Sequence, residues 1–235
     1  MPLSKPSAPI LCYVTDRQSL PRTSAGVSEQ DSLGALLHTI TTAAAAGVHW
    51  IQIREKDLSG KDCSSLVRAA LGFVKSAHSS VRILVNDRLD VAIAERAAGV
   101  HLGENGLPVS EAKRLLLRDP QPASSAQDLV ADFTVGVSCH SLAAATSTAA
   151  AGADYIFFGP VFPTPSKSSY GPPQGLARLS EICRAVSVPV LAIGGITAEN
   201  AADCLRAGAS GIAAIRLFQD DRDLPAVVQR LANPS

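Results

Sequence analysis

The sequence lacks several features that mark special classes of protein. It carries 21 lysines and arginines against 21 aspartates and glutamates, so no net charge attracts nucleic acid or an anionic membrane. No apolar run approaches the roughly 20 residues of a membrane span. Residues 1–9 lack the basic segment and apolar core of a signal peptide. We therefore expect no nucleic-acid and no membrane partner, and any anion site must be local.

The cysteines also show no spacing that predicts disulfides or a metal site. The five cysteines are odd in number, lie far apart and form no Cys-x-x-Cys pair. Such spacing argues against a zinc site or a disulfide framework and favours reduced thiols, which indicates a cytoplasmic location. The cysteines are Cys12, Cys63, Cys139, Cys183 and Cys204.

The composition of the 235 residues is that of a globular protein, with 46% hydrophobic and 18% charged residues. Short apolar runs alternate with alanine- and leucine-rich amphipathic stretches. Several runs are apolar on both faces, which is typical of parallel strands covered by helices. The predicted strands are Ile10–Thr15, Trp50–Arg54, Ile83–Asn86, Val100–Leu102, Thr134–Ser138, Tyr155–Gly159, Val190–Ile193 and Gly211–Ile215.

Predicted helices alternate with these strands at 31–46, 61–78, 88–97, 109–117, 141–151, 176–186, 198–207 and 223–232. Ser141, before an alanine run, has the character of a helix N-cap. An Ala-Gly dipeptide recurs between helix and strand, at Gly47, Gly99, Gly152 and Gly208, where glycine suits a left-handed helix end. The spacing of 52 to 56 residues approximates two βα units.

This repeat predicts an α/β fold, a single-domain (β/α)8 TIM barrel. The alternative is an open doubly wound sheet, although no Gly-x-Gly-x-x-Gly follows the first strand. We expect residues 1–9 to form a flexible tail and 10–235 the catalytic domain. Segments 17–30 and 160–174 are long for plain connections, and long loops after strands build the active sites of barrels. Whether 17–30 closes as a lid stays open.

Cationic and amide side chains follow the second predicted strand. Alternation places Gln52, Arg54 and Lys56 on one side, and two cations there can hold a phosphate group. The plainer interpretation is a cluster of rim salt bridges with Glu55 and Asp57.

Polar residues also end the third and fifth strands. Asn86 and Asp87 offer oxygen ligands for Mg2+, or alternatively a helix N-cap. Ser138 and His140 face a substrate in this interpretation, and His140 can transfer protons near neutral pH. Cys139 is interpreted as a core residue, since no partnered base is evident.

Two further loops complete the predicted mouth. The segment after the sixth strand presents Thr164, Ser166 and Lys167 among prolines that stiffen it, as a clamp for a charged ligand or as a plain proline-rich loop. Gly194 and Gly195 end the seventh strand, where backbone N–H groups and the start of a helix near Thr197 can bind phosphate. A tight turn without a ligand is the alternative.

These strand ends resemble the thiamine phosphate synthase/TenI family. The resemblance runs from Leu11 to about Phe218 and rests on seven ordered motifs: Tyr13-Val14-Thr15-Asp16, Gln52-Ile53-Arg54-Glu55-Lys56, Val85-Asn86-Asp87-Arg88, Gly99-Val100-His101-Leu102-Gly103, Gly136-Val137-Ser138-Cys139-His140-Ser141, Gly159-Pro160-Val161-Phe162-Pro163-Thr164 and Ala192-Ile193-Gly194-Gly195-Ile196.

The resemblance implies a synthase that joins hydroxymethylpyrimidine diphosphate to a thiazole phosphate and releases diphosphate. Small phosphorylated pyrimidine and thiazole substrates are then the partners, and Mg2+ the cofactor. By resemblance, the members of the site have three roles. Diphosphate is held by Arg54, Lys56 and Lys167, with Mg2+ on Asp87; the pyrimidine is contacted by Gln52 and Asn86; the thiazole phosphate is held by Thr164, Ser166 and the backbone near Gly195.

The sequence departs from the synthase pattern at two positions. Synthases usually carry a second metal aspartate where this chain has Gly106, and Glu104 and Asn105 are the candidate replacements, although their side chains start elsewhere. They also place a small Ser-Ala pair after strand eight, where this chain has Arg216, an added phosphate ligand or a residue that fills part of the pocket.

The departures keep two other hypotheses open. A TenI-type thiazole tautomerase uses His140 as general acid/base and needs no metal cofactor. A non-catalytic binder of thiamine phosphate is the third. The sequence leaves open whether the chain forms homo-oligomers.

Overall fold

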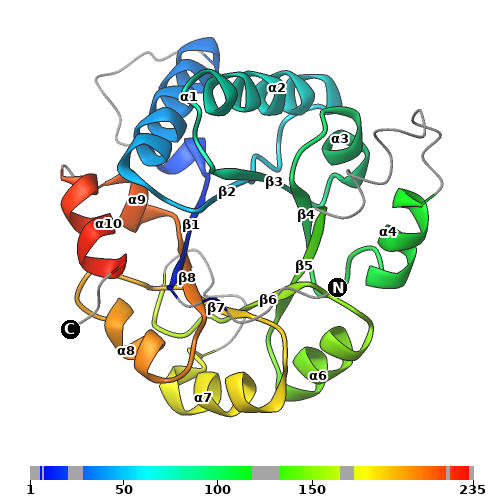
Figure 1. The fold of residues 1–235 in the computed structure, drawn as a ribbon, viewed down its shortest axis with the longest axis vertical. Coiled ribbons are helices and arrows are strands. Elements are labelled where there is room, and N and C mark those ends of the chain that lie inside the picture. The colour runs from blue at the N-terminus through cyan, green and yellow to red at the C-terminus, as the bar shows by residue number, and fades with distance from the viewer. Residues whose placement is uncertain are drawn as a thin grey trace.

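Eight parallel strands close into a barrel in the computed structural model, which describes residues 6, 8–20, 29–117, 133–164, 172–220 and 223–232. Each strand pairs with its neighbours in sequence, and β1 pairs with β8 to complete the ring (Figure 1). The predicted single-domain (β/α)8 barrel is confirmed, and a closed ring is incompatible with the open sheet.

The strands lie within about one residue of their predicted bounds. Their ranges are β1 Ile10–Val14, β2 Trp50–Ile53, β3 Arg82–Asn86, β4 Gly99–Leu102, β5 Thr134–Cys139, β6 Tyr155–Phe158, β7 Val190–Ile193 and β8 Gly211–Ala214.

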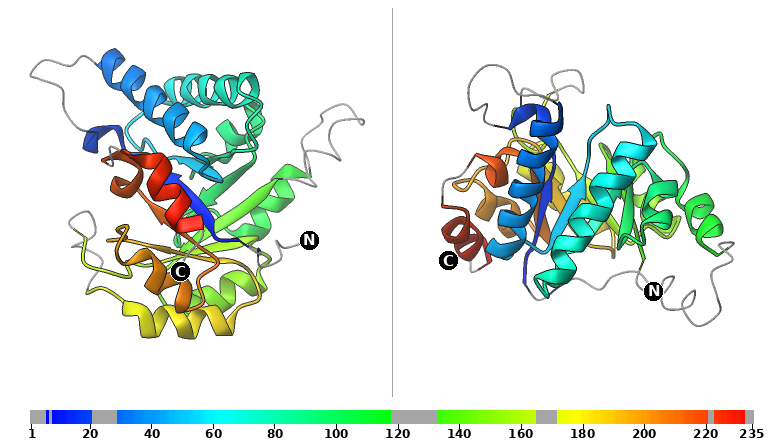
Figure 2. Two further views of the ribbon diagram at one scale, coloured as in Figure 1. Left: turned by 60° about the vertical axis from the view of Figure 1, so that its left-hand side comes forward. Right: turned by 90° about the horizontal axis from the view of Figure 1, so that it is seen from above.

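Helices surround the barrel, as the turned views also show (Figure 2). Their ranges are α1 Glu29–Ala46, α2 Gly60–Ser76, α3 Leu89–Ala94, α4 Val109–Leu116, α6 Leu142–Ala150, α7 Gly175–Ala185, α8 Ala201–Arg206, α9 Arg216–Gln219 and α10 Leu224–Ala232. None of the helices in the described part of the chain is long and apolar enough to cross a membrane.

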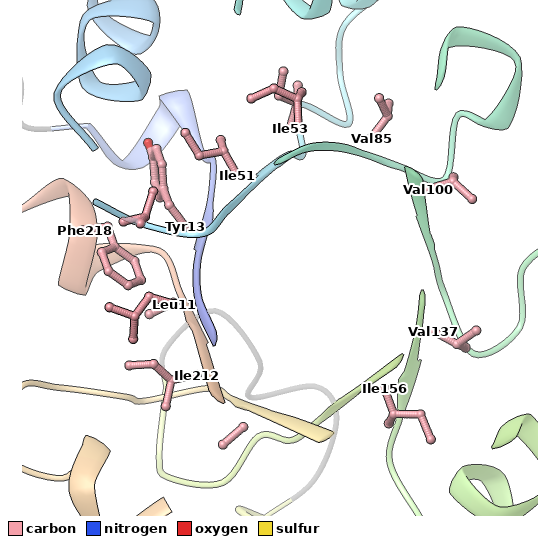
Figure 3. Close-up of a cluster of buried hydrophobic side chains, with 14 of the residues drawn as sticks. Leu11, Tyr13, Ile51, Ile53, Val85, Val100, Val137, Ile156, Ile212 and Phe218 are labelled. Carbon is pink, nitrogen blue, oxygen red and sulfur yellow. The ribbon is translucent and has the colours of Figure 1, made fainter. Parts of the chain in front are cut away.

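Alternate residues of each strand face two separate cores. Cys12 and Val14 join Trp50 in a cluster inside the barrel, whereas Leu11 and Tyr13 join the larger cluster between strands and helices. Figure 3 shows side chains of this larger cluster, which point outward from the strands all around the barrel. Burial on both faces explains why the strands are continuously apolar in sequence. All five cysteines lie within the described residues, where they are buried and form no disulfide with one another.

Some local predictions were wrong. Helix α8 begins at Ala201 rather than near residue 198, and two short helices were missed: η1, Arg17–Ser19, and α9. Gly47, Gly152 and Gly208 have the expected positive φ, but Gly99 does not. Gly99 lies in β4, where a Cβ would come within 2.2 Å of the Thr134 carbonyl oxygen, so close strand packing requires this glycine.

Ser141 is the N-cap of α6, as predicted, and its side chain accepts a hydrogen bond from the Ala144 N–H.

The packing of Gly136 against Tyr155 gives a test of the barrel core. A Cβ on Gly136 would lie 2.0 Å from Cζ of Tyr155, so Gly136→Ala should lower the free energy of unfolding by about 1–3 kcal/mol. Gly72→Ala is the matched control. Gly72 is exposed in α2 with nothing near a new Cβ, so this change should raise the free energy of unfolding by about 0.4–1 kcal/mol. Urea unfolding followed by circular dichroism measures both, and equal values would contradict the proposed packing.

Candidate active site

The predicted polar residues gather where the carboxyl ends of the strands meet. Residues following β2, β3, β5, β7 and β8 come together there because the strands of a closed parallel barrel all end on the same side. Ser166 and Lys167 lie outside the described residues, as does most of the 17–30 segment considered as a lid.

Arg54 and Lys56 have no ion pair with any described residue. The neighbouring acids are bound instead by Arg17, whose Nη1 lies 3.1 Å from Glu55 Oε2 and 2.6 Å from Asp57 Oδ1. The predicted alternative, a salt-bridge cluster of Arg54 and Lys56 with these acids, is therefore wrong. Arg17 was missed, since the sequence marks it only as part of a long loop.

Glu55 is buried and anchors the loop after β1. It accepts hydrogen bonds from Thr15 Oγ1 at 2.6 Å and from the Arg17 backbone N–H. The Arg17 guanidinium also lowers the pKa of Asp57 by hydrogen bonding to its carboxylate. The carboxylates of Glu55 and Asp57 are thus both ion-paired with Arg17.

A chain of side-chain hydrogen bonds joins β2 to β3. Gln52 Nε2 donates to Asn86 Oδ1 at 3.1 Å, and Asn86 Nδ2 donates to Asp87 Oδ2 at 2.8 Å. Asp87 Oδ1 accepts from the Gly103 N–H at 2.9 Å. Asn86 and Asp87 do not cap a helix: α3 has Arg88 at its N-cap, without a side-chain capping bond. That alternative is wrong.

Lys56, Asn86 and Asp87 share one cavity of about 260 Å3 beside α2. Its remaining walls are formed by Ile53, Glu55, Leu58, Cys63 and Arg88. An ammonium and a carboxylate therefore lie at the same hollow, which is the arrangement expected for a charged ligand with a bound cation.

The second metal carboxylate is missing from the described residues. No group of three or more His, Cys, Asp or Glu side chains there is arranged to hold a metal ion. Glu104 Oε2 instead accepts a hydrogen bond from the His140 backbone N–H at 2.9 Å. A Cβ built on Gly106 would lie 3.8 Å from Asp87 Oδ1, so position 106 faces the metal-ligand candidate.

Ser138 ends a hydrogen-bonded chain that runs through the barrel interior. His101 Nε2 lies 2.9 Å from Ser138 Oγ, and His101 Nδ1 lies 3.1 Å from the Tyr155 hydroxyl. Burial raises the pKa of Tyr155, so its phenol stays protonated. His101 thus links the buried Tyr155 hydroxyl to Ser138, and the tautomer of its ring decides which partner of each hydrogen bond donates. His101 stands within a quoted motif, yet its role was missed.

His140 and Cys139 differ in what they can do. His140 Nδ1 faces the carbonyl oxygen of Gly159, which can only accept, so Nδ1 carries a proton. Cys139 is buried and its thiol contacts Thr148 Oγ1, and burial raises its pKa to about 11. Cys139 is thus a core residue, as expected.

A second cavity of about 300 Å3 lies between the loops after β1, β6, β7 and β8. Its lining is formed by Asp16, Ser19, Pro163, Thr164, Ile193, Gly194, Gly195, Ile196, Thr197, Ala214, Ile215 and Arg216. Arg216 has no ion pair or hydrogen-bond partner for its side chain among the described residues. The structure thus brings Thr164, the glycine pair and Arg216 together.

The glycine pair serves packing as well as the cavity. Gly194 and Gly195 have φ of +95° and +67°, and a Cβ on Gly195 would lie 2.5 Å from the Pro163 carbonyl oxygen. The N–H groups of Gly195 and Ile196 donate to no acceptor among the described residues, so both are available to an anion.

The sequence predicted that a helix starting near Thr197 helps to bind phosphate, but α8 begins only at Ala201, so this prediction is wrong. The Thr197 N–H donates to Asn200 Oδ1 at 2.8 Å, and Asn200 Nδ2 donates to the Gly195 carbonyl oxygen at 2.9 Å. Asn200 thus fixes the turn after β7 and displaces the helix start. Asn200 was missed, although asparagine ahead of a helix is itself a start signal.

Comparisons with known proteins agree with this geometry. Residues 25–218 match the family model for thiamine monophosphate synthase. The thiamine-phosphate synthase of Methanoculleus marisnigri is 46% identical over 80% of this chain and 82% of its own length. That of Roseiflexus castenholzii is 38% identical over 99% of this chain and 91% of its own length.

A solved structure agrees as well. The thiamine phosphate pyrophosphorylase from Pyrococcus furiosus superposes with a TM-score of 0.73 at 28% identity, covering 95% of this chain and 98% of that one. The family match spans most of the chain, including the residues after β2 and β3 that line the first cavity and those after β6, β7 and β8 that line the second. The chain therefore belongs to the thiamine monophosphate synthase family.

Proposed function

We propose that the mouth of this barrel joins hydroxymethylpyrimidine diphosphate to a thiazole phosphate. The bond between the pyrimidine methyl carbon and the diphosphate oxygen breaks, the thiazole nitrogen forms a bond to that carbon, and diphosphate leaves. One observation carries the proposal: Arg54, Lys56 and Arg216 stand at the mouth without ion-pair partners among the described residues, in a chain of zero formal net charge.

The first step needs stabilisation of the departing diphosphate, where negative charge accumulates. Arg54 offers a planar fork and Lys56 a compact ammonium, and both are held near the end of β2. Lys167, which follows β6 in sequence, is assigned to the same group by the family resemblance. Unpaired cations are ready for this role because no internal ion pair must first break.

The pyrimidine side of the proposed site is polar and constrained. The Gln52–Asn86 hydrogen bond fixes two amides at the ends of β2 and β3, where they can bind ring nitrogens and an amino group. Ser138 is oriented by His101 from below. These contacts orient the methyl carbon toward the incoming thiazole, which is the positioning part of catalysis.

The thiazole phosphate is assigned to the second cavity. Its anionic end would contact the Gly195 and Ile196 N–H groups, with Arg216 as the cation and Thr164 and Ser166 as hydroxyl donors. Arg216 takes the place of the small Ser-Ala pair of the family and adds charge to this end.

The described residues fit Mg2+ that is shared with the substrate. Mg2+ is usually bound through one or two carboxylates together with substrate phosphates and water, and Asp87 supplies one carboxylate beside Lys56. Asp87 would hold the ion, with Asn86 nearby. When bound, Mg2+ neutralises charge on the leaving diphosphate.

Substrate coupling tests the proposed function directly. With both substrates and Mg2+, the protein should form thiamine phosphate and diphosphate in equal amounts, measured by chromatography and a diphosphate assay. Arg54→Gln and Lys56→Gln should each lower kcat by about 100- to 1,000-fold, because each removes a charge that stabilises the leaving group.

The control for these variants is Arg68→Gln. Arg68 is paired with Glu95 on the exposed face of α2, so its loss should change kcat by less than about twofold. Absence of product would refute the synthase assignment. Metal-independent thiazole tautomerisation that is lost in His140→Asn would then support the tautomerase. Product binding without either reaction would support the binder.

Because Asp87 supplies only one carboxylate, we predict that adding a second one nearby raises the affinity for a divalent metal ion. Gly106→Asp should place a second carboxylate beside Asp87 and tighten Mn2+ binding to the substrate-free protein by about tenfold or more. Isothermal titration calorimetry with Mn2+ alone measures this. Gly106→Asn, which has the same size but no charge, should leave the affinity unchanged. Equal Mn2+ affinities in the two variants would show that position 106 does not face the metal site.

A further inference from the structure

The short helix α9 carries two polar residues with different surroundings. Arg216, at its start, is exposed and lines the second cavity, which the proposed function assigns to the thiazole phosphate. Gln219, at its end, is 9% exposed and takes no part in that cavity. A buried amide costs free energy unless it is hydrogen-bonded, so the partners of Gln219 are informative.

Gln219 uses both ends of its amide on the segment that ends β1. Its Oε1 accepts from the Tyr13 hydroxyl at 3.0 Å and from the Asp16 N–H at 3.1 Å. Its Nε2 donates to the Asp16 carbonyl oxygen and to Ser19 Oγ, both at 3.2 Å. Three of these four contacts go to the loop Asp16–Ser19, and all connect residues about 200 positions apart in sequence.

The loop and the helix are two walls of one cavity. Asp16 and Ser19 line it from the β1 side, and Ile215 and Arg216 line it from the β8 side. The loop is also fixed to the segment after β2, because Arg17 pairs with Glu55 and Asp57. β8 pairs with β1, and Leu217 and Phe218 bury the start and middle of α9, whereas the bonds of Gln219 join its end directly to the loop.

We propose that Gln219 is a positioning residue for the thiazole phosphate pocket. By joining α9 to the loop Asp16–Ser19, it sets the separation of the two walls and the point from which Arg216 reaches the phosphate. Gln219 does not touch substrate, and it acts through Arg216 and the loop. The inference rests on the proposed function, because it takes the second cavity as the thiazole phosphate site.

The competing explanation is that Gln219 only stabilises the fold. The Michaelis constants for the two substrates distinguish this explanation from a positioning role. Gln219→Met has similar length and no hydrogen bonds. It should raise KM for thiazole phosphate by about fivefold to twentyfold, because a displaced Arg216 and loop would form one or two fewer hydrogen bonds to the substrate. Because the diphosphate site lies at β2 and β3, KM for the pyrimidine diphosphate should change by less than about twofold.

Tyr13→Phe is the matched control. It removes one hydrogen bond to the same Oε1 but leaves the three contacts to the loop, so it should lower thermal stability without changing KM for thiazole phosphate. Gln219→Met leaves the buried Tyr13 hydroxyl without its partner. If this variant fails to fold, the double variant Tyr13→Phe/Gln219→Met removes that hydroxyl and allows the same measurement.

Arg216→Gln and its combination with Gln219→Met complete the test. A residue that acts through Arg216 gives a double variant whose KM for thiazole phosphate rises less than the product of the two single effects. If Arg216→Gln raises this KM and Gln219→Met does not, the positioning role is overturned and the proposed function stands. If the wild-type protein forms no thiamine phosphate, the proposed function itself fails.

Discussion

The ion pairs of Arg17 with Glu55 and Asp57 determine the electrostatics of the whole mouth. Glu55 lies between Arg54 and Lys56 in sequence and Asp57 follows Lys56, so both acids are candidate partners of these cations. By binding both acids, Arg17 fixes the loop after β1 and leaves the two cations without partners among the described residues. An anionic substrate can supply the partner that each of these cations lacks.

The fold could be predicted because it follows from local patterns. Each strand faces a core on both sides, so strands such as Val190–Ile193 appear in sequence as short apolar runs, and the recurring helix–strand spacing implies closure. The site could be predicted in outline for a related reason. Strand ends of a barrel meet at one mouth, so polar residues after strands are candidates wherever they occur.

What could not be predicted depends on contacts between distant residues. Arg17 lies about 40 positions before Glu55 and Asp57 in sequence, so the pattern after β2 alone leaves open the alternative that these acids pair with Arg54 and Lys56. Asn200 moves the start of α8 by bonding to Gly195, and Gln219 orders the loop near Asp16 from the other end of the chain. Glu104 illustrates the same limit: its sequence position suggested a metal ligand, and its carboxylate instead bonds to the His140 N–H.

The joining of α9 to the end of β1 also bears on how the protein comes to be active. One wall of the second cavity comes from residues 16–19 and another from residues 214–216. During synthesis the first is made long before the last, and contacts of such long sequence separation form late in folding because loop closure must precede them. The pocket is therefore absent until β8 docks on β1. Folding intermediates with an open barrel would lack this binding site, and a bound ligand would stabilise the closed ring over them.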